Sequence, residues 1–312
     1  MIGALAIVAI AIIVTSSGPR SADGVATIDY GNVVQTDNLA DVGAGDRRPS
    51  LRIAVAAMIS PKKTSDLYDD LLRLLADRVG RRAVFTQRKT YAEVNDMVER
   101  KEVDVAFVCS GPYVTGKAKF GMEILVVPVV GGQTVYHSYI LTHRDSPFSS
   151  FDALKGKRFA FTDPYSNTGC LVPKYMVARR GETPQSFFGD SYYTYSHDNS
   201  IKAVAEGLAD GAAVDSLIWE YAQATDPTYT AHTKIVEKSP PYGIPPVVVH
   251  PDLDPYVKQR LKETFLTLHE VQEAQGILRT LRIDRFVEGD DAAYDSVREM
   301  QRWIAQTGQE EP

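Results

Sequence analysis

Short apolar runs alternate with amphipathic stretches from residue 51 onward. The first runs cover residues 51–57, 83–86 and 103–108, which have the length and composition of buried strands. Between them, apolar side chains recur at helical spacing over residues 67–79 and 91–98. Strands that alternate with helices predict an α/β fold built on doubly wound, largely parallel sheets.

The same alternation continues through the middle of the chain. Further strand-like or extended runs lie at residues 123–130, 136–142, 158–161, 192–195, 212–215 and 247–250. Helical spacing covers residues 171–180 and 201–208, and the tail from 256 to 307 is mostly helical. In such sheets ligands bind outside the carboxyl ends of the strands. The loops after Ala57 and Val108 therefore belong to one ligand-facing edge.

The first 50 residues follow a different pattern. Residues 1–17 form an apolar block that is too short for a comfortable membrane span but suits a signal peptide, although no Lys or Arg precedes it. An uncleaved N-terminal anchor is the second interpretation, and a buried strand or helix is the third. No Cys follows the block, so a bacterial lipoprotein is not expected. Residues 18–50 are rich in Gly, Asp, Ser and Asn, which predicts a disordered linker.

Composition narrows the function classes. The 312 residues are 44% hydrophobic and 24% charged, as in an ordinary soluble globular protein, and the net charge is −6. No basic run is present, which argues against nucleic acid as a partner. The two cysteines form no CxxC motif and no Cys/His cluster, so we expect no metal site and no cofactor.

The most informative stretch runs from Phe161 to Gly169. It is predicted to leave a buried strand, turn at Asp163-Pro164 and enter a helix. Ser166, Asn167 and Thr168 can bond an anion there, together with the N–H groups at the start of the helix. Gly169 allows the backbone to approach a ligand closely. An ordinary capped helix start has the same residue types, and the stretch alone fits that alternative better.

Two further strand ends carry polar side chains. His197 and Asp215 each follow a predicted strand, so a doubly wound lobe places them at the same edge as the Ser166–Thr168 turn. An imidazole can donate to an oxyanion, whereas an ionised Asp215 only accepts and suits a ligand that carries a proton or an amine. His197 could instead brace its turn, and Asp215 could cap a helix.

Neighbouring residues have structural interpretations. Asp198 and Asn199 are predicted to cap the helix that follows them. The tyrosines at 192, 193 and 195 are predicted to pack in a strand rather than to bind a cofactor.

Taken in order, these motifs resemble the phosphate/phosphite/phosphonate-binding proteins of bacterial ABC importers, a branch of the type II periplasmic binding proteins. The resemblance covers about residues 51–305. It is carried by five segments: Val103-Asp-Val-Ala-Phe with Gly111-Pro-Tyr-Val, residues 154–169, residues 196–207, Ala212-Ala-Val-Asp-Ser and residues 240–246.

The resemblance implies a periplasmic protein of two lobes, each a doubly wound sheet flanked by helices. Lobe 1 is expected to comprise residues 51–138 and 241–312, and lobe 2 residues 139–240. The lobes are expected to be joined by crossings near residues 136–141 and 238–246.

In that family the Ser/Thr-rich turn, the His and the Asp grip a tetrahedral oxyanion. The resemblance therefore implies ligand roles for Ser166, Asn167, Thr168, His197 and Asp215, beside Gly169. An aromatic side chain of the first lobe usually contributes, and Tyr68 is the candidate. An ABC permease is the implied partner, and we expect a monomer.

Two departures from the family pattern leave the ligand open. The usual Ser/Thr pair is Asn167-Thr168 here, and Cys109 ends a first-lobe strand at the ligand edge. A thiol suits a soft ion, and some similar proteins are periplasmic arsenite sensors that signal to a membrane histidine kinase. Cys109 could equally be a small buried apolar residue. A Cys109–Cys170 disulfide would join the lobes and block ligand release, so we rank it lower.

An enzyme is the third functional class. No nucleophile elbow, P-loop, zinc motif or dinucleotide-binding glycine pattern lies between a strand and a helix. His197 and Asp215 with a Ser could imitate a triad, but nothing in their order supports one. The sequence therefore favours a binding protein over an enzyme.

Overall fold

The structure is a computed structural model that describes residues 46–306. The predicted signal peptide or anchor at 1–17 and most of the predicted linker at 18–50 lie outside these residues. The first element in the described residues is strand β1, which starts at Ser50, one residue before the predicted Leu51. Within the described residues, no helix is both long and apolar enough to cross a membrane.

A six-stranded sheet is built from both ends of the described chain. Its order is β13 (Arg285–Val287), β4 (Glu123–Val129), β12 (Val247–Val249), β3 (Val105–Phe107), β1 (Ser50–Val55), β2 (Arg82–Gln87). Strand β1 pairs in parallel with β2 and β3, whereas β12 and β13 pair antiparallel to their neighbours.

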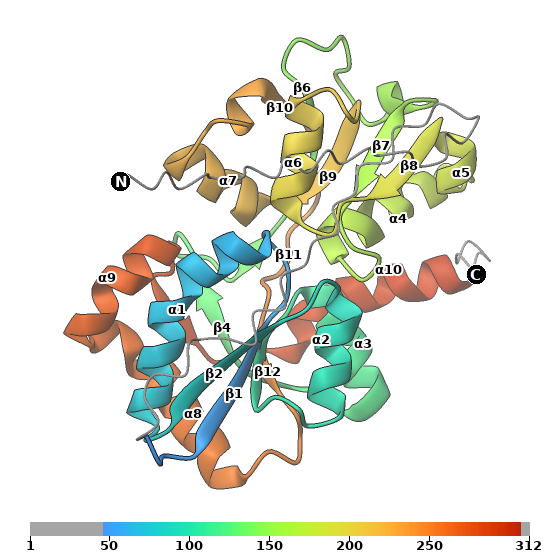
Figure 1. Cartoon of the computed structure of the whole chain (residues 1–312). Helices are drawn as coiled ribbons and strands as arrows, with labels where there is room; N and C mark the ends of the chain where they lie inside the picture. The colour runs from blue at the N-terminus through green and yellow to red at the C-terminus, as the bar shows by residue number, and fades with distance from the viewer. Residues whose placement is uncertain (1–45, 307–312) are drawn as a thin grey trace, which may run out of the picture. The chain divides into compact units, whose positions relative to one another are not determined.

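Helices cover both faces of this sheet (Figure 1). One face packs against α1 (Pro61–Arg78), α8 (Pro255–Thr267) and α9 (Gln272–Leu281), and the other against α2 (Tyr91–Glu99) and α3 (Ser110–Phe120). The alternation along β1 explains the two cores. Ile53 and Val55 belong to the first apolar cluster, and Ala54 belongs to the second, because successive side chains point to opposite faces.

A five-stranded sheet comes from the middle of the chain. Its order is β10 (Thr233–Lys238), β6 (Ser138–His143), β9 (Gly211–Asp215), β7 (Arg158–Phe161), β8 (Asp190–Tyr193). Strands β9, β7 and β8 run in parallel, so their carboxyl ends lie at one edge. Helices α4 (Val172–Ala178) and α5 (Pro184–Phe187) pack on one face, and α6 (His197–Ala205) and α7 (Ser216–Thr225) on the other.

Two segments pass between the sheets. Along the chain, strand β5 (Val135–Tyr136) connects β4 to β6, and β11 (Tyr242–Gly243) connects β10 to β12. They pair antiparallel as a two-stranded ribbon. We call the six-stranded sheet with its helices the first lobe and the five-stranded sheet with its helices the second lobe.

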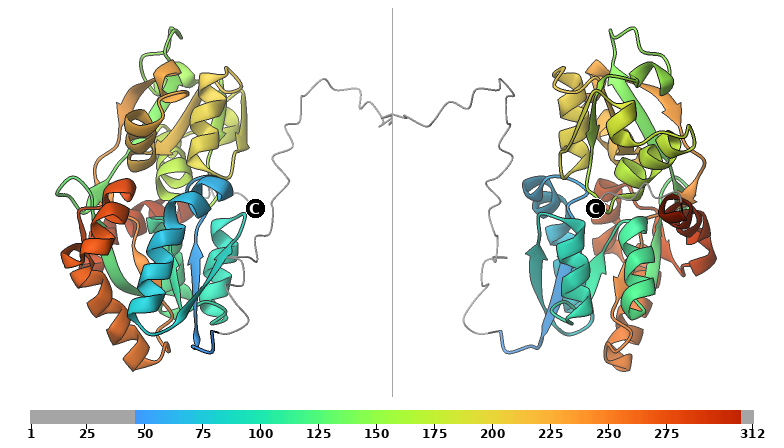
Figure 2. Two further views of the ribbon diagram at one scale, coloured as in Figure 1. Left: turned by 60° about the vertical axis from the view of Figure 1, so that its left-hand side comes forward. Right: turned by 90° about the vertical axis from the view of Figure 1, so that its right-hand side faces the viewer.

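The last helix spans the two lobes. Helix α10 (Asp295–Gln306), which follows the edge strand β13, packs against α3 of the first lobe and α4 of the second (Figure 2). The sequence predicted a mostly helical tail and no strand within it, so β13 was not foreseen. Its three residues pair with β4, and only Phe286 is fully buried, so it has too few apolar positions to show strand alternation.

Candidate functional site

The turn after β7 enters a π-helical turn, Asn167–Leu171, before α4. Ser166 caps it, since its Oγ accepts from the Gly169 N–H at 3.0 Å. A Cβ at Gly169 would lie 2.5 Å from the Thr162 Cβ, so only glycine fits there. The Asn167 Nδ2 donates to the Tyr136 hydroxyl at 3.1 Å. The Asn167 Oδ1 and the Thr168 Oγ have no hydrogen-bond partner among residues 46–306, although both residues are fully buried.

His197 begins α6 at the end of β8. Its Nδ1 accepts the backbone N–H of Asp215 at 3.1 Å, so the neutral ring carries its proton on Nε2. Burial lowers the pKa of His197 to about 3, and the ring is therefore neutral at physiological pH. The buried Nε2 has no partner. This ring is thus a fixed, uncharged donor.

Two tyrosines that the sequence did not single out reach the same place. Tyr91, the first residue of α2, is fully buried, and its hydroxyl has no partner. Burial raises its pKa well above the usual value, with further contributions from nearby Cys109 and Asp163. Tyr136 lies in the crossing strand β5 and contacts both Asn167 and Cys109.

We call Tyr91, Thr168 and His197 the donor cluster; Asn167 lies in the same turn as Thr168, but its unpaired atom is an amide oxygen, which only accepts. Each member of the cluster is fully buried, and each holds a side-chain polar atom without a partner. Leaving one such group unpaired costs about 1–3 kcal/mol. Three such buried donors, Tyr91 from the first lobe and Thr168 and His197 from the second, are typical of a site that is completed by a small polar ligand.

Asp215 does what the structural alternative predicted, because it caps α7. Its Oδ1 accepts from the Leu217 N–H at 2.7 Å. The carboxyl group is also buried, which raises its pKa to about 7 despite the bonds from Leu217 and Ile218. It lines the cavity described below, so a role towards ligand remains compatible with the cap.

The cysteines lie in different places. Cys109 precedes α3, and its Sγ lies 3.5 Å from the Tyr136 hydroxyl, beside the donor cluster. Burial raises the pKa of this thiol, and the backbone N–H of Asn167 opposes that shift. Cys170 packs in the aromatic core of the second lobe, near Phe159 and Phe161. Both are free thiols, so the disulfide ranked lower above is absent from the described residues.

Two aspartates of the second lobe cap helices of the first. The Asp163 Oδ2 accepts the N–H of Tyr91, the first residue of α2, at 3.1 Å. The Asp198 Oδ1 accepts the N–H of Ser60, which precedes α1, at 2.9 Å. The prediction that Asp198 and Asn199 cap their own helix is therefore wrong, since Ser196 is at the N-cap position of α6 and the Asn199 Nδ2 donates to the Thr194 carbonyl oxygen at 3.2 Å. A carboxylate is stabilised at the start of α6 or of α1, and Asp198 bonds to the start of α1 in the other lobe.

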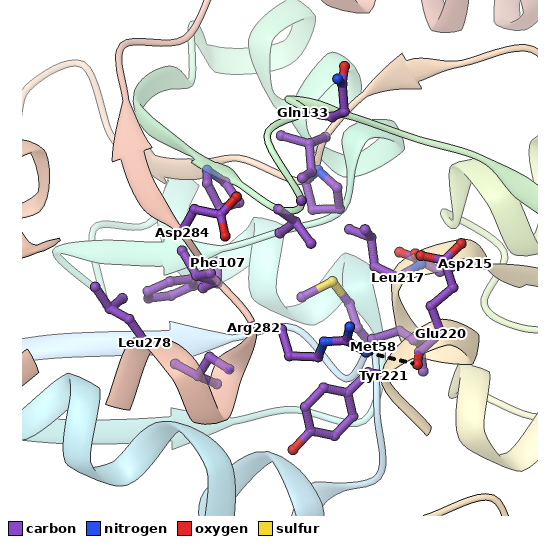
Figure 3. Close-up of a pocket in the computed structure, with 18 of the residues that line it drawn as sticks. Met58, Phe107, Gln133, Asp215, Leu217, Glu220, Tyr221, Leu278, Arg282 and Asp284 are labelled. Atoms are coloured by element: carbon purple, nitrogen blue, oxygen red, sulfur yellow. Dashed lines mark hydrogen bonds between the residues drawn. The ribbon is translucent and has the colours of Figure 1, made fainter. Parts of the chain in front are cut away.

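A cavity adjoins the donor cluster through Asp215 and Met58, both of which line it and bond to His197. Its volume is about 780 Å³, and its wall includes Asp215, Leu217 and Phe107 (Figure 3). Tyr68 lines this cavity rather than the cluster, with its ring packed edge-on against Phe107 at 5.4 Å. Burial raises the pKa of Tyr68 to about 12, so its hydroxyl is neutral.

Metal binding finds no support among residues 46–306. No group of three or more His, Cys, Asp or Glu side chains lies close enough there to hold an ion.

The chain matches the model of one protein family over most of its length. That family is described as the periplasmic substrate-binding proteins of phosphonate ABC transporters, and the match covers residues 53–294. The phosphate-import protein PhnD of Mycolicibacterium smegmatis is 28% identical over 274 residues, which cover 78% of this chain and 83% of the relative. The phosphonates-binding periplasmic protein of Escherichia coli is 21% identical over 267 residues, covering 84% and 79%.

Solved structures agree with the fold. A binding protein component of an ABC phosphonate transporter from Pseudomonas aeruginosa gives a TM-score of 0.79 at 22% identity, covering 84% of this chain and 88% of its own. A Prochlorococcus marinus protein, solved in complex with methylphosphonate, gives 0.74 at 18% identity, covering 82% and 98%. These likenesses confirm the predicted two-lobed fold. Because the family match spans both lobes, the chain belongs to the family of periplasmic substrate-binding proteins of phosphonate ABC transporters.

Proposed function

We propose that the protein binds a tetrahedral phosphorus oxyanion, such as phosphate, phosphite or a phosphonate, and delivers it to an ABC permease. The observation that carries this proposal is the donor cluster. It offers the hydroxyls of Tyr91 and Thr168 and the Nε2–H of His197, all buried and without partners. Hydrogen bonds from neutral donors to a charged oxygen are short and strong, so these groups match an anion.

Each predicted site residue has a place in this proposal. Thr168 and His197 donate to the anion, while Asn167 holds the Tyr136 hydroxyl towards it. Gly169 lets the π-helical turn lie close to the ligand, and Ser166 fixes that turn through its cap. The ionised Asp215 carboxylate accepts a hydrogen bond from the hydroxyl of a protonated oxyanion. Tyr68 and Cys109 form the surroundings on the first-lobe side.

Transport follows from the two lobes. Closure around the anion would bury it, and the closed form would dock on the permease as a monomer. No enzymatic step is needed for this role, and we propose none. The matched relatives are named as import or binding proteins for phosphorus compounds, which supports import over the sensor alternative.

Calorimetry with phosphate, phosphite, methylphosphonate and arsenite tests the proposal. We expect at least one phosphorus anion to bind with a Kd in the micromolar range or tighter, about −8 kcal/mol or better. We expect Thr168→Val to weaken that binding. Binding of arsenite alone, abolished in Cys109→Ser, would instead support the sensor. Sustained ester hydrolysis that Ser166→Ala abolishes would support an enzyme.

A further inference from the structure

The cavity beside the donor cluster is far larger than the anion needs. Its volume of about 780 Å³ is roughly 26 times the ~30 Å³ that one water molecule occupies in the liquid. Cavities of about 300–1,000 Å³ hold drug-sized organic ligands. Methylphosphonate, with five heavy atoms, would leave most of this space unused.

The cavity and the donor cluster share a wall. Asp215 lines the cavity, and its backbone N–H donates to the ring of His197. Met58 also lines it, and its carbonyl oxygen accepts the His197 N–H at 3.0 Å. The Met58 side chain projects into the cavity in Figure 3, and an unbranched thioether can move aside readily. A group attached to an anion in the cluster therefore has a short route into the cavity.

Much of the cavity wall consists of apolar side chains from both lobes, among them Ile59, Leu67, Phe107, Val108, Leu217 and Ile244. Asp215 is an ionisable wall residue whose backbone contacts His197, and the Leu217 N–H already satisfies one of its carboxylate oxygens. The charged wall residues are exposed, among them Glu220 and Arg282, which meet where the Arg282 guanidinium donates to the Glu220 carbonyl oxygen at 3.3 Å.

We propose that this cavity holds an apolar substituent of the ligand, so that the substrate class is an alkyl or aryl phosphonate or the matching phosphate monoester. The inference rests on the proposed function, because the donor cluster must hold the phosphorus group. The substituent would replace Met58 in the cavity and contact the apolar side chains of both lobes. Its burial would then favour the closed form in proportion to its apolar surface.

A chain-length series tests the cavity directly. Calorimetry would compare methyl-, propyl- and hexylphosphonate, and pentyl phosphate, which has the same number of chain atoms as the hexyl compound. Each buried methylene should tighten binding about four-fold until the cavity is filled. The comparison of hexylphosphonate with pentyl phosphate shows whether the phosphonate or the phosphate ester is preferred. Propylphosphonate should also bind at least about ten-fold more tightly than 2-aminoethylphosphonate, which has the same shape but a charged end that is costly to bury.

Leu217→Gln places a polar side chain of similar size in the wall. We expect it to weaken hexylphosphonate about ten-fold or more and to leave methylphosphonate within about two-fold, because only the longer ligand loses apolar contact. Ala224→Gln introduces the same side chain at an exposed position on the same helix, outside the cavity, and is the matched control.

The outcomes separate the two proposals. If methylphosphonate binds and longer chains bind no better, the cavity proposal is wrong while the proposed function stands. Tighter binding of 2-aminoethylphosphonate than of propylphosphonate also overturns it. If no phosphorus anion binds the wild-type protein, both proposals fail together.

Discussion

Replacing Tyr91 by Phe separates a ligand-binding hydroxyl from a structural one. The substitution removes one oxygen atom and keeps the ring that fills the first-lobe core. The hydroxyl is buried and makes no hydrogen bond within the part of the chain that the structure describes. If it belongs to the oxyanion site, its loss weakens binding without removing any bond from the fold.

The magnitude follows from the type of bond. A hydrogen bond to a charged group contributes about 1.5–3 kcal/mol, which corresponds to about 10- to 150-fold in affinity. The unfolding free energy of Tyr91→Phe should rise or stay constant, although its affinity for the anion falls. An unpartnered buried hydroxyl costs about 1–3 kcal/mol, and Phe does not carry that cost.

The assay pairs calorimetry with the phosphorus anion that binds best and thermal unfolding without ligand. Tyr113→Phe is the matched control. Tyr113 is buried in the same apolar core of the first lobe as Tyr91, but its hydroxyl donates to Asp291. The control should lose stability and keep its affinity. Tyr91→Phe should do the reverse.

One result would refute this reasoning. If Tyr91→Phe lowers the unfolding free energy as Tyr113→Phe does, and affinity is unchanged, then the Tyr91 hydroxyl has a structural partner. The donor cluster would then lose its first-lobe member, and the proposed grip from both lobes would be wrong.

Three further predictions concern titration, closure and capping. In Asp215→Asn, the wild-type loss of unfolding free energy between about pH 4 and 7 should disappear in chemical denaturation series, because the folded carboxyl holds its proton up to a pKa of about 7 and the unfolded one releases it near 4; an unchanged pH profile would contradict the buried carboxyl. Gly111→Ala should weaken binding more than about ten-fold, as a Cβ there meets the Tyr165 backbone of the other lobe, whereas Gly276→Ala, with open space around it, should not; equal calorimetric affinities would exclude this closed contact. Asp198→Ala should lower affinity about five-fold by removing the cap of α1 in the closed form, at about 1 kcal/mol, and an unchanged Kd would show that this cap does not favour closure.

The strand ends of the second lobe were predictable from local pattern. Strands β7 and β9 are short, mostly apolar runs followed by polar turns, whereas β8 is recognisable only by its tyrosines; parallel neighbours bring the carboxyl ends of all three together. The alternation of apolar runs and helical spacing is a local property of the chain. It therefore indicated where Thr168, His197 and Asp215 would meet.

Side chains from the first lobe were harder to identify. Tyr91 occupies an apolar position of its helix, and its ring lies in the core. The helical spacing of apolar residues therefore does not indicate that its hydroxyl belongs to a binding site. The sequence favoured Tyr68, which lies in the adjoining cavity instead. A tyrosine at the first turn of a helix that follows a parallel strand is the only local signal, and it is weak.

Contacts between distant segments were beyond any local pattern. Asp163 reaches Tyr91 across 72 residues, and Asp198 reaches Ser60 across 138. Each aspartate also sits in a turn where a local cap is chemically adequate. Only the relative position of the lobes decides which helix start receives the carboxylate.

If the donor cluster holds the anion as proposed, the same groups disfavour an empty closed form. Closing without an anion buries the Tyr91, Thr168 and His197 donors unpaired, at about 1–3 kcal/mol each. The caps from Asp163 and Asp198 return only about 1 kcal/mol each. Because the donors are neutral, they also do not draw in cations or repel one another while the lobes are apart. In the proposed function an anion would satisfy these donors, and the two caps would then stabilise the closed form, so closure would be coupled to the ligand and the permease would receive mainly loaded protein.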